Sequence, residues 1–300
     1  MPSSPVPVNA IRGILLMLGT MFVFVVIDAV AKYLTASLPV MQVVWARNVF
    51  ALGFSLLMLR GRGATMLMAT RRPGLQLARS ALQFTSTAIF FTALYYIPLA
   101  DAIAIGFGSP LILTALSVPM LGEKVGPRRW AAVTAGFLGV LVIIRPGFGQ
   151  THWAMLLPVA MAFSSATYNL VTRMLAGEEH PMTTLWYTTL IGSVLTSAIV
   201  PFVWVSPGLA GWALMVLLGV VGGLGHFLLI KAFSHAPAST LAPFNYSQMI
   251  WSIPIGYLVF NNLPDLFTLL GAVIIALSGI YTIYRERRVR AAQGPSVSAT

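Results

Sequence analysis

The sequence predicts an all-α membrane protein of ten transmembrane helices, and three observations support this fold class. Hydrophobic residues make up 58% of the 300 residues and charged residues only 8%, against roughly 25% charged in soluble globular proteins. Apolar runs of about 20 residues, the length that crosses a bilayer core, recur along the chain. Lysine and arginine gather in alternate connections between these runs. A soluble fold of this size would have too few charges to cover its surface.

Ten apolar runs follow one another, and Pro, Gly or charged residues mark the breaks between them. The runs cover residues 12–34, 39–59, 75–96, 100–121, 128–145, 153–174, 182–204, 210–231, 239–260 and 265–284. Several connections are only a few residues long, so consecutive helices are expected to be antiparallel neighbours. The first run is too long for a removable signal, so we expect it to be retained as a span.

The net charge of +11 is interpreted as a topology signal and not as a nucleic-acid surface, because the bases lie between apolar runs. With a cytoplasmic N-terminus, 15 of the 18 Lys and Arg residues lie on the cytoplasmic side, two lie outside, and Arg47 lies within a span. Both termini are therefore expected in the cytoplasm, with the chain in the inner (plasma) membrane. The absence of cysteine excludes disulfides and thiolate metal ligands.

Two stretches resemble each other at an offset of 139 residues. Residues 93–98 (ALYYIP) and 232–237 (AFSHAP) each precede a span, a short turn and a Gly-rich span. A repeat of five spans is odd, so the second copy must enter the membrane inverted relative to the first. Inverted repeats of this kind are typical of secondary transporters, with the substrate site near the midplane between the halves.

The ordered motifs resemble the EamA branch of the drug/metabolite transporter superfamily. They are residues 45–51 (WARNVFA), 93–100 (ALYYIPLA), 121–126 (LGEKVG), 135–139 (AGFLG) and 145–147 (RPG). The second copy departs from the pattern, with Asn261 and Asn262 in place of Gly122 and Glu123. The resemblance implies a cytoplasmic tail at 1–11, one repeat at 12–147, a second at 152–284, and a basic cytoplasmic tail at 285–300. Within the branch, the chain resembles bacterial exporters of amino acids, including aromatic ones.

Asp28 and Arg47 are ionisable residues within predicted spans, where such groups are usually functional or paired. They lie roughly 9 Å and 12 Å from the outer ends of spans one and two, at 1.5 Å per residue. This similar depth predicts an ion pair. The pair is either a coupling or gating element or a structural clamp.

The ninth span has an unusually polar middle. Asn245, Gln248 and Ser252 recur at i, i+3 and i+7 and therefore share one helix face, with Tyr246 and Trp251 beside them. Lipid does not tolerate these amides, so the face is expected to point into the bundle or a wet cavity. The alternative is simple hydrogen bonding between helices.

Further polar residues extend this predicted cavity. The repeat offset places Ser109 opposite Gln248 and Thr87 opposite His226, a histidine deep within a span. The predicted substrate-binding residues are Thr87, Ser109, Ser164, Tyr168, His226, Asn245, Tyr246, Gln248 and Trp251. Amides, hydroxyls and aromatic rings suit a small zwitterion with a bulky apolar side chain, such as an amino acid. Three prolines inside spans are predicted hinges: Pro110, Pro243 and Pro254.

The sequence therefore predicts a secondary transporter that exports amino acids and related small metabolites by alternating access. It contains no GxxxxGK[ST] motif, nucleophile–base spacing or metal-ligand cluster, so no enzyme activity, cofactor or metal is expected. The expected partners are a small-molecule substrate and the lipid bilayer, with no nucleic acid, and the chain is expected to be a monomer. Transport of a nucleoside, nucleotide sugar or drug, and a channel, are the alternatives.

Overall fold

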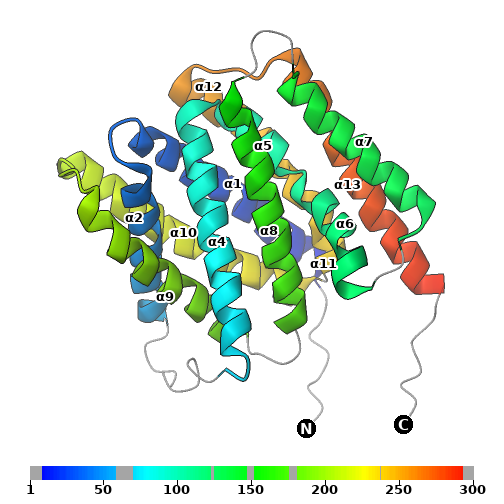
Figure 1. Ribbon diagram of the computed structural model, residues 1–300, viewed down its shortest axis with the longest axis horizontal. Helices are drawn as coiled ribbons and strands as arrows, with labels where there is room; N and C mark the ends of the chain where they lie inside the picture. Colours follow the sequence, from blue (N-terminus) through cyan, green and yellow to red (C-terminus); the bar gives the residue numbers. More distant parts are fainter. Residues whose placement is uncertain are drawn as a thin grey trace.

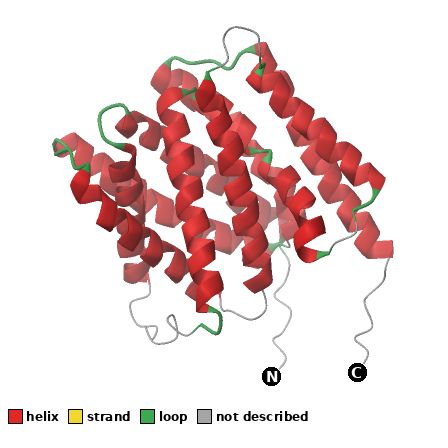
Figure 2. Ribbon diagram, in the orientation of Figure 1, coloured by secondary structure: helices red, strands yellow, loops and turns green. Residues whose placement is uncertain are grey.

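The computed structural model describes residues 9–58, 70–122, 125–146, 152–175, 181–236 and 238–292. Within these ranges every regular element is a helix, as Figure 2 shows. Arg60, Arg62 and Lys124, which belong to the 15 basic residues predicted on the cytoplasmic side, lie outside the described residues, as does Glu123.

Helices of varied length follow one another along the chain (Figure 1). The α-helices are α1 (Ala10–Thr35), α2 (Val40–Met58), α4 (Pro73–Tyr96), α5 (Leu99–Gly106), α6 (Ser109–Leu121), α7 (Pro127–Ile144), α8 (Leu156–Leu175), α9 (Pro181–Ile199), α10 (Leu209–His235), α11 (Ala238–Leu241), α12 (Ser247–Phe260) and α13 (Leu266–Ala292). Three short 3-10 helices join them: η1 (Trp153–Met155), η2 (Val200–Phe202) and η3 (Ala242–Tyr246).

Seven helical segments are long and apolar enough to cross a membrane, which makes the chain a multi-pass membrane protein. They are Ala10–Thr35, Val40–Leu57, Leu99–Met120, Pro127–Ile144, Trp153–Thr172, Leu209–His235 and Leu266–Arg285. Three of the ten predicted spans, at 75–96, 182–204 and 239–260, are not among them. The predicted count of ten, and the cytoplasmic position of both termini, stay predictions.

The three helical regions outside this set are more polar or shorter for a reason visible in their sequences. Helix α4 buries Gln76, Arg79 and Ser80, α9 carries several threonines, and α12 has only 14 residues after the interruption at η3. These regions supply many of the polar groups that the following sections describe. In α4 the lower hydropathy reflects inward-facing polar side chains, whereas the apolar segment Trp186–Phe202 and helix α12 are outside the set because they are short.

Two of the predicted spans are interrupted. Helix α5 ends at Gly106, and α6 starts at Ser109, with Pro110 in its first turn. Proline has no N–H to donate to the carbonyl four residues earlier, here that of Gly106, so the helix cannot continue regularly. Pro243 lies in η3, at the second interruption. Helix α12, in contrast, continues through Pro254.

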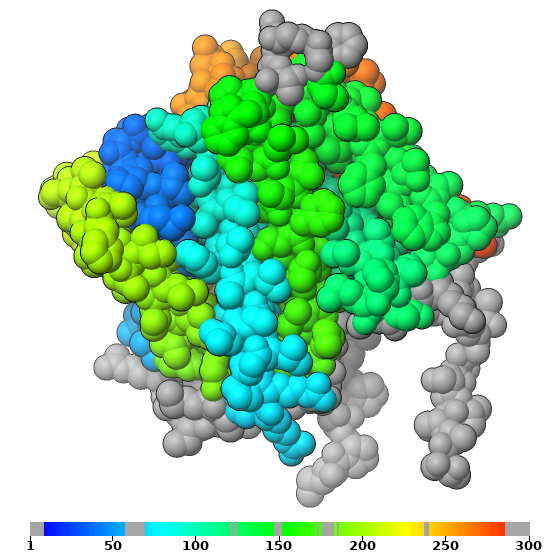
Figure 3. All heavy atoms as spheres, viewed as in Figure 1, coloured from blue at the N-terminus to red at the C-terminus, as the bar shows by residue number. Residues whose placement is uncertain are grey.

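The bundle is held together largely by contacts between its two halves, residues 10–146 and 152–292. Helix α13 packs along α7, α10 packs against α1 and α2, and α4 packs against α8 and α9 (Figure 1). Figure 3 shows α4, α8 and α9 forming one continuous face of the molecule. Each half therefore depends on the other to bury its apolar surface.

Glycine permits close contacts between helices of the two halves. A Cβ atom added at Gly271 of α13 would lie 2.6 Å from the Gly139 carbonyl oxygen of α7. Small residues at such positions let two helix backbones approach closely. The α7–α13 pair is therefore built on direct backbone proximity.

Candidate functional site

A cavity of about 310 Å³ lies between the two halves. Helices α1, α2, α4 and α5 of the first half line it, together with α8, α10 and α12 of the second. Its polar lining residues are Asp28, Arg47, Gln83, Ser86, Thr87, Ser165, His226 and Gln248. Its volume is at the lower end of the range of small-molecule sites, roughly 300–1,000 Å³.

Asp28 and Arg47 both line this cavity but do not form the predicted ion pair. The Gln248 side-chain amide donates to the Asp28 carboxylate at 3.2 Å, and the Arg47 guanidinium donates to the Thr87 hydroxyl at 3.0 Å. The guanidinium carbon also lies 5.9 Å from the centre of the Phe91 ring. Similar depth on two consecutive helices does not make their side chains point at each other. Asp28 and Arg47 each form a hydrogen bond with a neutral group on another helix instead. Opposite charges are therefore presented separately to one cavity.

His226 and Thr87, which the repeat offset pairs, both reach the cavity lining. The His226 ring lies against the Phe24 ring, with centroids 5.3 Å apart. Gln83 is the residue one turn before Thr87 on α4, and its amide donates to the Thr87 hydroxyl at 3.4 Å. The histidine is thus one polar group among several around the cavity.

Aromatic rings form the apolar part of the wall. Phe24, Phe90, Phe91 and Phe107 all line the cavity. Phe107 lies at the α5–α6 interruption and contacts Tyr246 of η3, with ring centroids 5.0 Å apart. These two residues are related by the 139-residue offset, so equivalent interruptions of the two halves meet beside the cavity.

Other predicted substrate-binding residues lie outside the cavity lining. Ser164 donates to the Leu82 carbonyl oxygen at 2.9 Å, and Tyr168 accepts a hydrogen bond from Arg79. Trp251 packs edge-on against Phe22. Tyr246 contacts the lining residue Phe107 but does not itself line the cavity. Ser109 and Asn245 are also absent from the lining. Of the nine predicted residues, Thr87, His226 and Gln248 line the cavity.

The sequence interpretation missed Gln83, Ser86 and the aromatic wall. Gln83 and Ser86 precede Thr87 by four residues and by one, and Phe90 follows it by three, so helical spacing places all of them toward the same side of α4. Extending the face from Thr87 would have found the two polar residues. Nothing in the sequence distinguishes Phe24, Phe90 and Phe91 from ordinary apolar residues of a span.

The fold and the site define a class: a multi-pass helical membrane protein with a small amphipathic cavity between two structurally dependent halves. The sequence model of the EamA-like transporter family matches this chain twice, at residues 11–145 and 152–285. The chain belongs to the EamA-like transporter family, within the drug/metabolite transporter superfamily. The two matches account for the two halves of the bundle.

Several proteins that are named as transporters are similar to the chain over most of their length. An S-adenosylmethionine uptake transporter of Rickettsia bellii is 31% identical over 261 residues, covering 87% of this chain and 89% of the relative. A riboflavin transporter of Vibrio cholerae is 32% identical over 274 residues, covering 90% and 92%. A pseudopaline exporter of Pseudomonas aeruginosa is 28% identical over 274 residues, covering 89% and 94%.

A solved crystal structure has the same fold. The two structures superpose with a TM-score of 0.65 at 16% sequence identity, and the match covers 93% of this chain and 99% of the chain in the crystal structure. Together these comparisons show that the chain is a transporter of the EamA type. None of these three relatives is named as an amino-acid exporter, so the comparisons leave the predicted amino-acid cargo unsupported.

Proposed function

We propose that this transporter carries amino acids, or small metabolites that contain an α-amino-acid group, by alternating access. The observation that carries the proposal is the presence of Asp28, Arg47 and an aromatic wall in one cavity. A zwitterion with an apolar side chain needs all three features. The predicted direction, export from the cytoplasm, is part of the proposal.

Each charge in the cavity has a complementary part in such a substrate. A guanidinium presents several N–H donors in a planar fork that matches a carboxylate. Arg47 uses one N–H on Thr87, which leaves donors for a substrate carboxylate. Asp28 accepts one hydrogen bond from Gln248, so its carboxylate retains acceptor sites for an ammonium group. Phe24, Phe90 and Phe91 would then contact the apolar side chain.

The similar transporters support a substrate of this kind in part. S-adenosylmethionine, named for the Rickettsia relative, contains an α-amino-acid group and a flat aromatic ring. The relatives are named for both uptake and export, so they do not select a direction for this chain.

A second candidate is a flat neutral molecule such as riboflavin, named for the Vibrio relative. The observation that favours it is the aromatic wall, combined with the Gln83 and Gln248 amides and the Ser86 and Thr87 hydroxyls. An aromatic ring system would stack on the phenylalanines while polar groups bond the amides. This candidate leaves the two charges of Asp28 and Arg47 without a role in recognition.

Uptake into proteoliposomes containing the purified protein separates these candidates. The panel contains phenylalanine, threonine, methionine, S-adenosylmethionine, riboflavin and a nucleoside, each tested with an outward and an inward gradient. We expect saturable flux of at least one compound that carries an amino-acid group. Flux of riboflavin or the nucleoside alone would overturn the proposed substrate class while leaving the family assignment intact.

A further inference from the structure

We propose that Arg79 and the Arg145–Asp265 pair are the residues that close the substrate cavity at its two opposite ends. This inference rests on the proposed alternating-access function, in which only one end is open at a time. It assigns a positioning role to side chains that lie outside the cavity itself. Helix α4 runs past the cavity, with Arg79 toward one of its ends and the Arg145–Asp265 pair near the other.

Arg79 joins α4 to the second half of the bundle. Its guanidinium donates to the Tyr168 and Thr172 hydroxyls of α8, at 2.5 Å and 2.7 Å. On α9 it donates to the Thr188 hydroxyl at 2.5 Å and the Thr184 carbonyl oxygen at 3.2 Å. We call these five residues the Arg79 cluster.

The charge of Arg79 is buried without a carboxylate. The residue is only 7% exposed, and no described carboxylate lies within ion-pair distance of it. Neutral oxygens and the Tyr168 ring, whose centre lies 4.4 Å from the guanidinium carbon, therefore compensate the charge. Burying a charge without an opposite charge beside it costs free energy. An uncharged residue could make a purely structural contact here without that cost.

The partners of Arg79 are arranged so that they can release it. The Thr172 hydroxyl donates to the Tyr168 carbonyl oxygen at 2.7 Å, and the Thr188 hydroxyl donates to the Thr184 carbonyl oxygen at 2.8 Å. These bonds lie within α8 and within α9, so they persist when the helices separate from α4. Opening at this end leaves the guanidinium and the Tyr168 hydroxyl without their shared bond, and both then meet the water that enters. The two threonine hydroxyls therefore keep a hydrogen-bond acceptor whether this end is closed or open.

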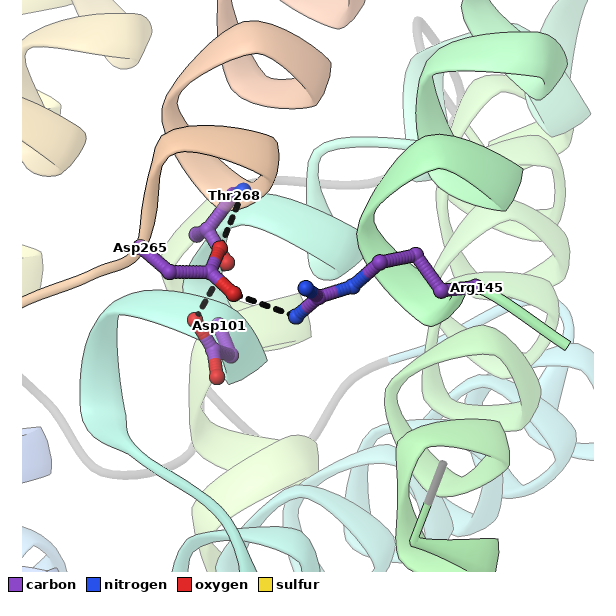
Figure 4. Close-up of polar contacts among 4 residues, drawn as sticks. All are labelled: Asp101, Arg145, Asp265 and Thr268. Atoms are coloured by element: carbon purple, nitrogen blue, oxygen red, sulfur yellow. Dashed lines mark hydrogen bonds and ion pairs between the residues drawn. The ribbon is translucent and has the colours of Figure 1, made fainter. Parts of the chain in front are cut away.

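A second polar group joins the halves at the other end of α4. Arg145, the residue that ends α7, forms an ion pair with Asp265, which precedes α13. Thr268 of α13 donates its backbone N–H to Asp265 at 2.8 Å and its hydroxyl to Asp101 of α5 at 2.9 Å. Figure 4 shows these contacts. We call these four residues the Asp265 cluster.

The chain itself places the Asp265 cluster near the end of α4, because α4 ends at Tyr96 and Asp101 lies in the first turn of α5. Lys32 of α1 binds this end of α4. Its ammonium group donates to the Leu94 and Ile97 carbonyl oxygens, at 2.5 Å and 2.7 Å, at the end of α4 from which the chain turns into α5 and Asp101. Arg79 and Leu94 are fifteen residues apart on α4, roughly 22 Å at 1.5 Å per residue. The two clusters therefore lie toward opposite ends of α4, the helix whose first residues are lower and whose last residues are upper in Figure 1.

The cavity lies between the two clusters. The α4 residues that line it, Gln83, Ser86, Thr87, Phe90 and Phe91, all fall between Arg79 and Leu94. Both clusters join helices of the first half to helices of the second, and helices around the cavity must move apart at one end to admit a substrate. Breaking either cluster should therefore expose the cavity from one side only.

The accessibility of an introduced cysteine tests the proposal. Because the chain contains no cysteine, a single substitution introduces the only thiol and no native cysteine has to be removed first. Ser86→Cys places one thiol in the cavity lining. Its rate of reaction with a membrane-impermeant maleimide is measured from each side, in right-side-out and inside-out vesicles. The measurement is repeated with Arg79→Gln and with Asp265→Asn added. No substrate is required, so failure of the proposed amino-acid transport would leave this result interpretable.

We expect Arg79→Gln to increase the labelling rate severalfold from one side and Asp265→Asn to increase it severalfold from the opposite side. Arg145→Gln should reproduce the effect of Asp265→Asn, because it breaks the same ion pair. Arg128→Gln, which removes an exposed arginine at the start of α7, is the matched control and should leave both rates unchanged.

Thr188→Val keeps the proposal testable if Arg79→Gln does not fold. It removes one acceptor of the guanidinium and should give a smaller increase on the same side as Arg79→Gln. Increases on the same side for the two clusters, or unchanged rates in folded variants, would overturn the proposal.

Discussion

Gln248 of α12 donates its side-chain amide to the carboxylate of Asp28 on α1, at 3.2 Å. The bond crosses from the second half of the bundle to the first and lies in the lining of the cavity. It orients the carboxylate while occupying only part of its acceptor capacity. Asp28 is thereby held in place and still able to bind a substrate.

Asp28→Asn should impair transport of zwitterionic substrates, because the amide cannot form the charge-assisted bond with an ammonium group. Hydrogen bonds to charged groups are worth about 1.5–3 kcal/mol, so we expect KM to rise roughly 10- to 100-fold. Initial uptake rates at equal protein incorporation measure this. Ser55→Ala, which removes a hydroxyl bonded within its own helix α2, is the control. An unchanged KM would show that Asp28 has no part in recognition.

Arg47→Gln should weaken recognition of the substrate carboxylate, and Arg47→Lys should restore only part of the affinity, since lysine lacks the planar fork. We expect a rise in KM of roughly tenfold or more for carboxylate-bearing substrates. Amide analogues of the same amino acids serve as the comparison, because their weak transport should be nearly unaffected by the substitution. An equal loss for acids and amides would indicate a structural role for Arg47.

The Arg145–Asp265 pair should be insensitive to pH near neutrality. Burial raises the pKa of Asp265, but the Thr268 backbone N–H and Arg145 outweigh burial and hold the pKa below its ordinary value of 3.8. A lowered carboxyl pKa means that the pair's contribution is fully present above about pH 5 and is lost only as pH falls through the lowered value. The rate at which maleimide labels Ser86→Cys from the side that the Asp265 cluster closes should therefore be constant between about pH 5 and pH 8. The rates are first corrected for the intrinsic pH dependence of thiol reactivity.

Gly271→Ala should destabilise the bundle, because the added methyl group would collide with the Gly139 carbonyl oxygen of α7 and with the Ile143 side chain. Overpacking of this kind costs about 1–3 kcal/mol. Gly53→Ala on α2 is the matched control, since nothing lies within 4 Å of its added methyl group. Thermal unfolding in detergent should give a lower midpoint for Gly271→Ala only, and equal midpoints would contradict the packing described for α7 and α13.

The sequence was informative about the helical membrane fold because its signal is redundant. Apolar runs, proline and glycine breaks and the 139-residue offset all agree, and the offset even relates Phe107 to Tyr246, which are in contact. The interruption at Phe107 could be anticipated from Pro110, since proline removes a backbone hydrogen bond wherever it falls in a helix. Pro254 shows the limit of this rule, because α12 continues through it.

Side-chain partners were less predictable than helices. The depth of Asp28 and Arg47 along their spans is a one-dimensional quantity, whereas their contacts with Gln248 and Thr87 depend on helix rotation and on packing between the halves. The same limit explains why Tyr168 was predicted to line the cavity, whereas in the structure its hydroxyl accepts a hydrogen bond from Arg79. Hydrogen bonds between the two halves depend on how the helices pack in three dimensions, and the spacing of residues along one helix does not predict that packing.

The most direct test of the proposed substrate class is counterflow in proteoliposomes preloaded with unlabelled methionine or phenylalanine. Wild-type protein should accumulate the corresponding labelled amino acid transiently, and the excess should be competed by the free amino acid far better than by its amide. In Arg47→Gln this preference for the acid over the amide should be lost. Counterflow driven only by riboflavin or a nucleoside, or equal competition by acid and amide in the wild type, would contradict the account.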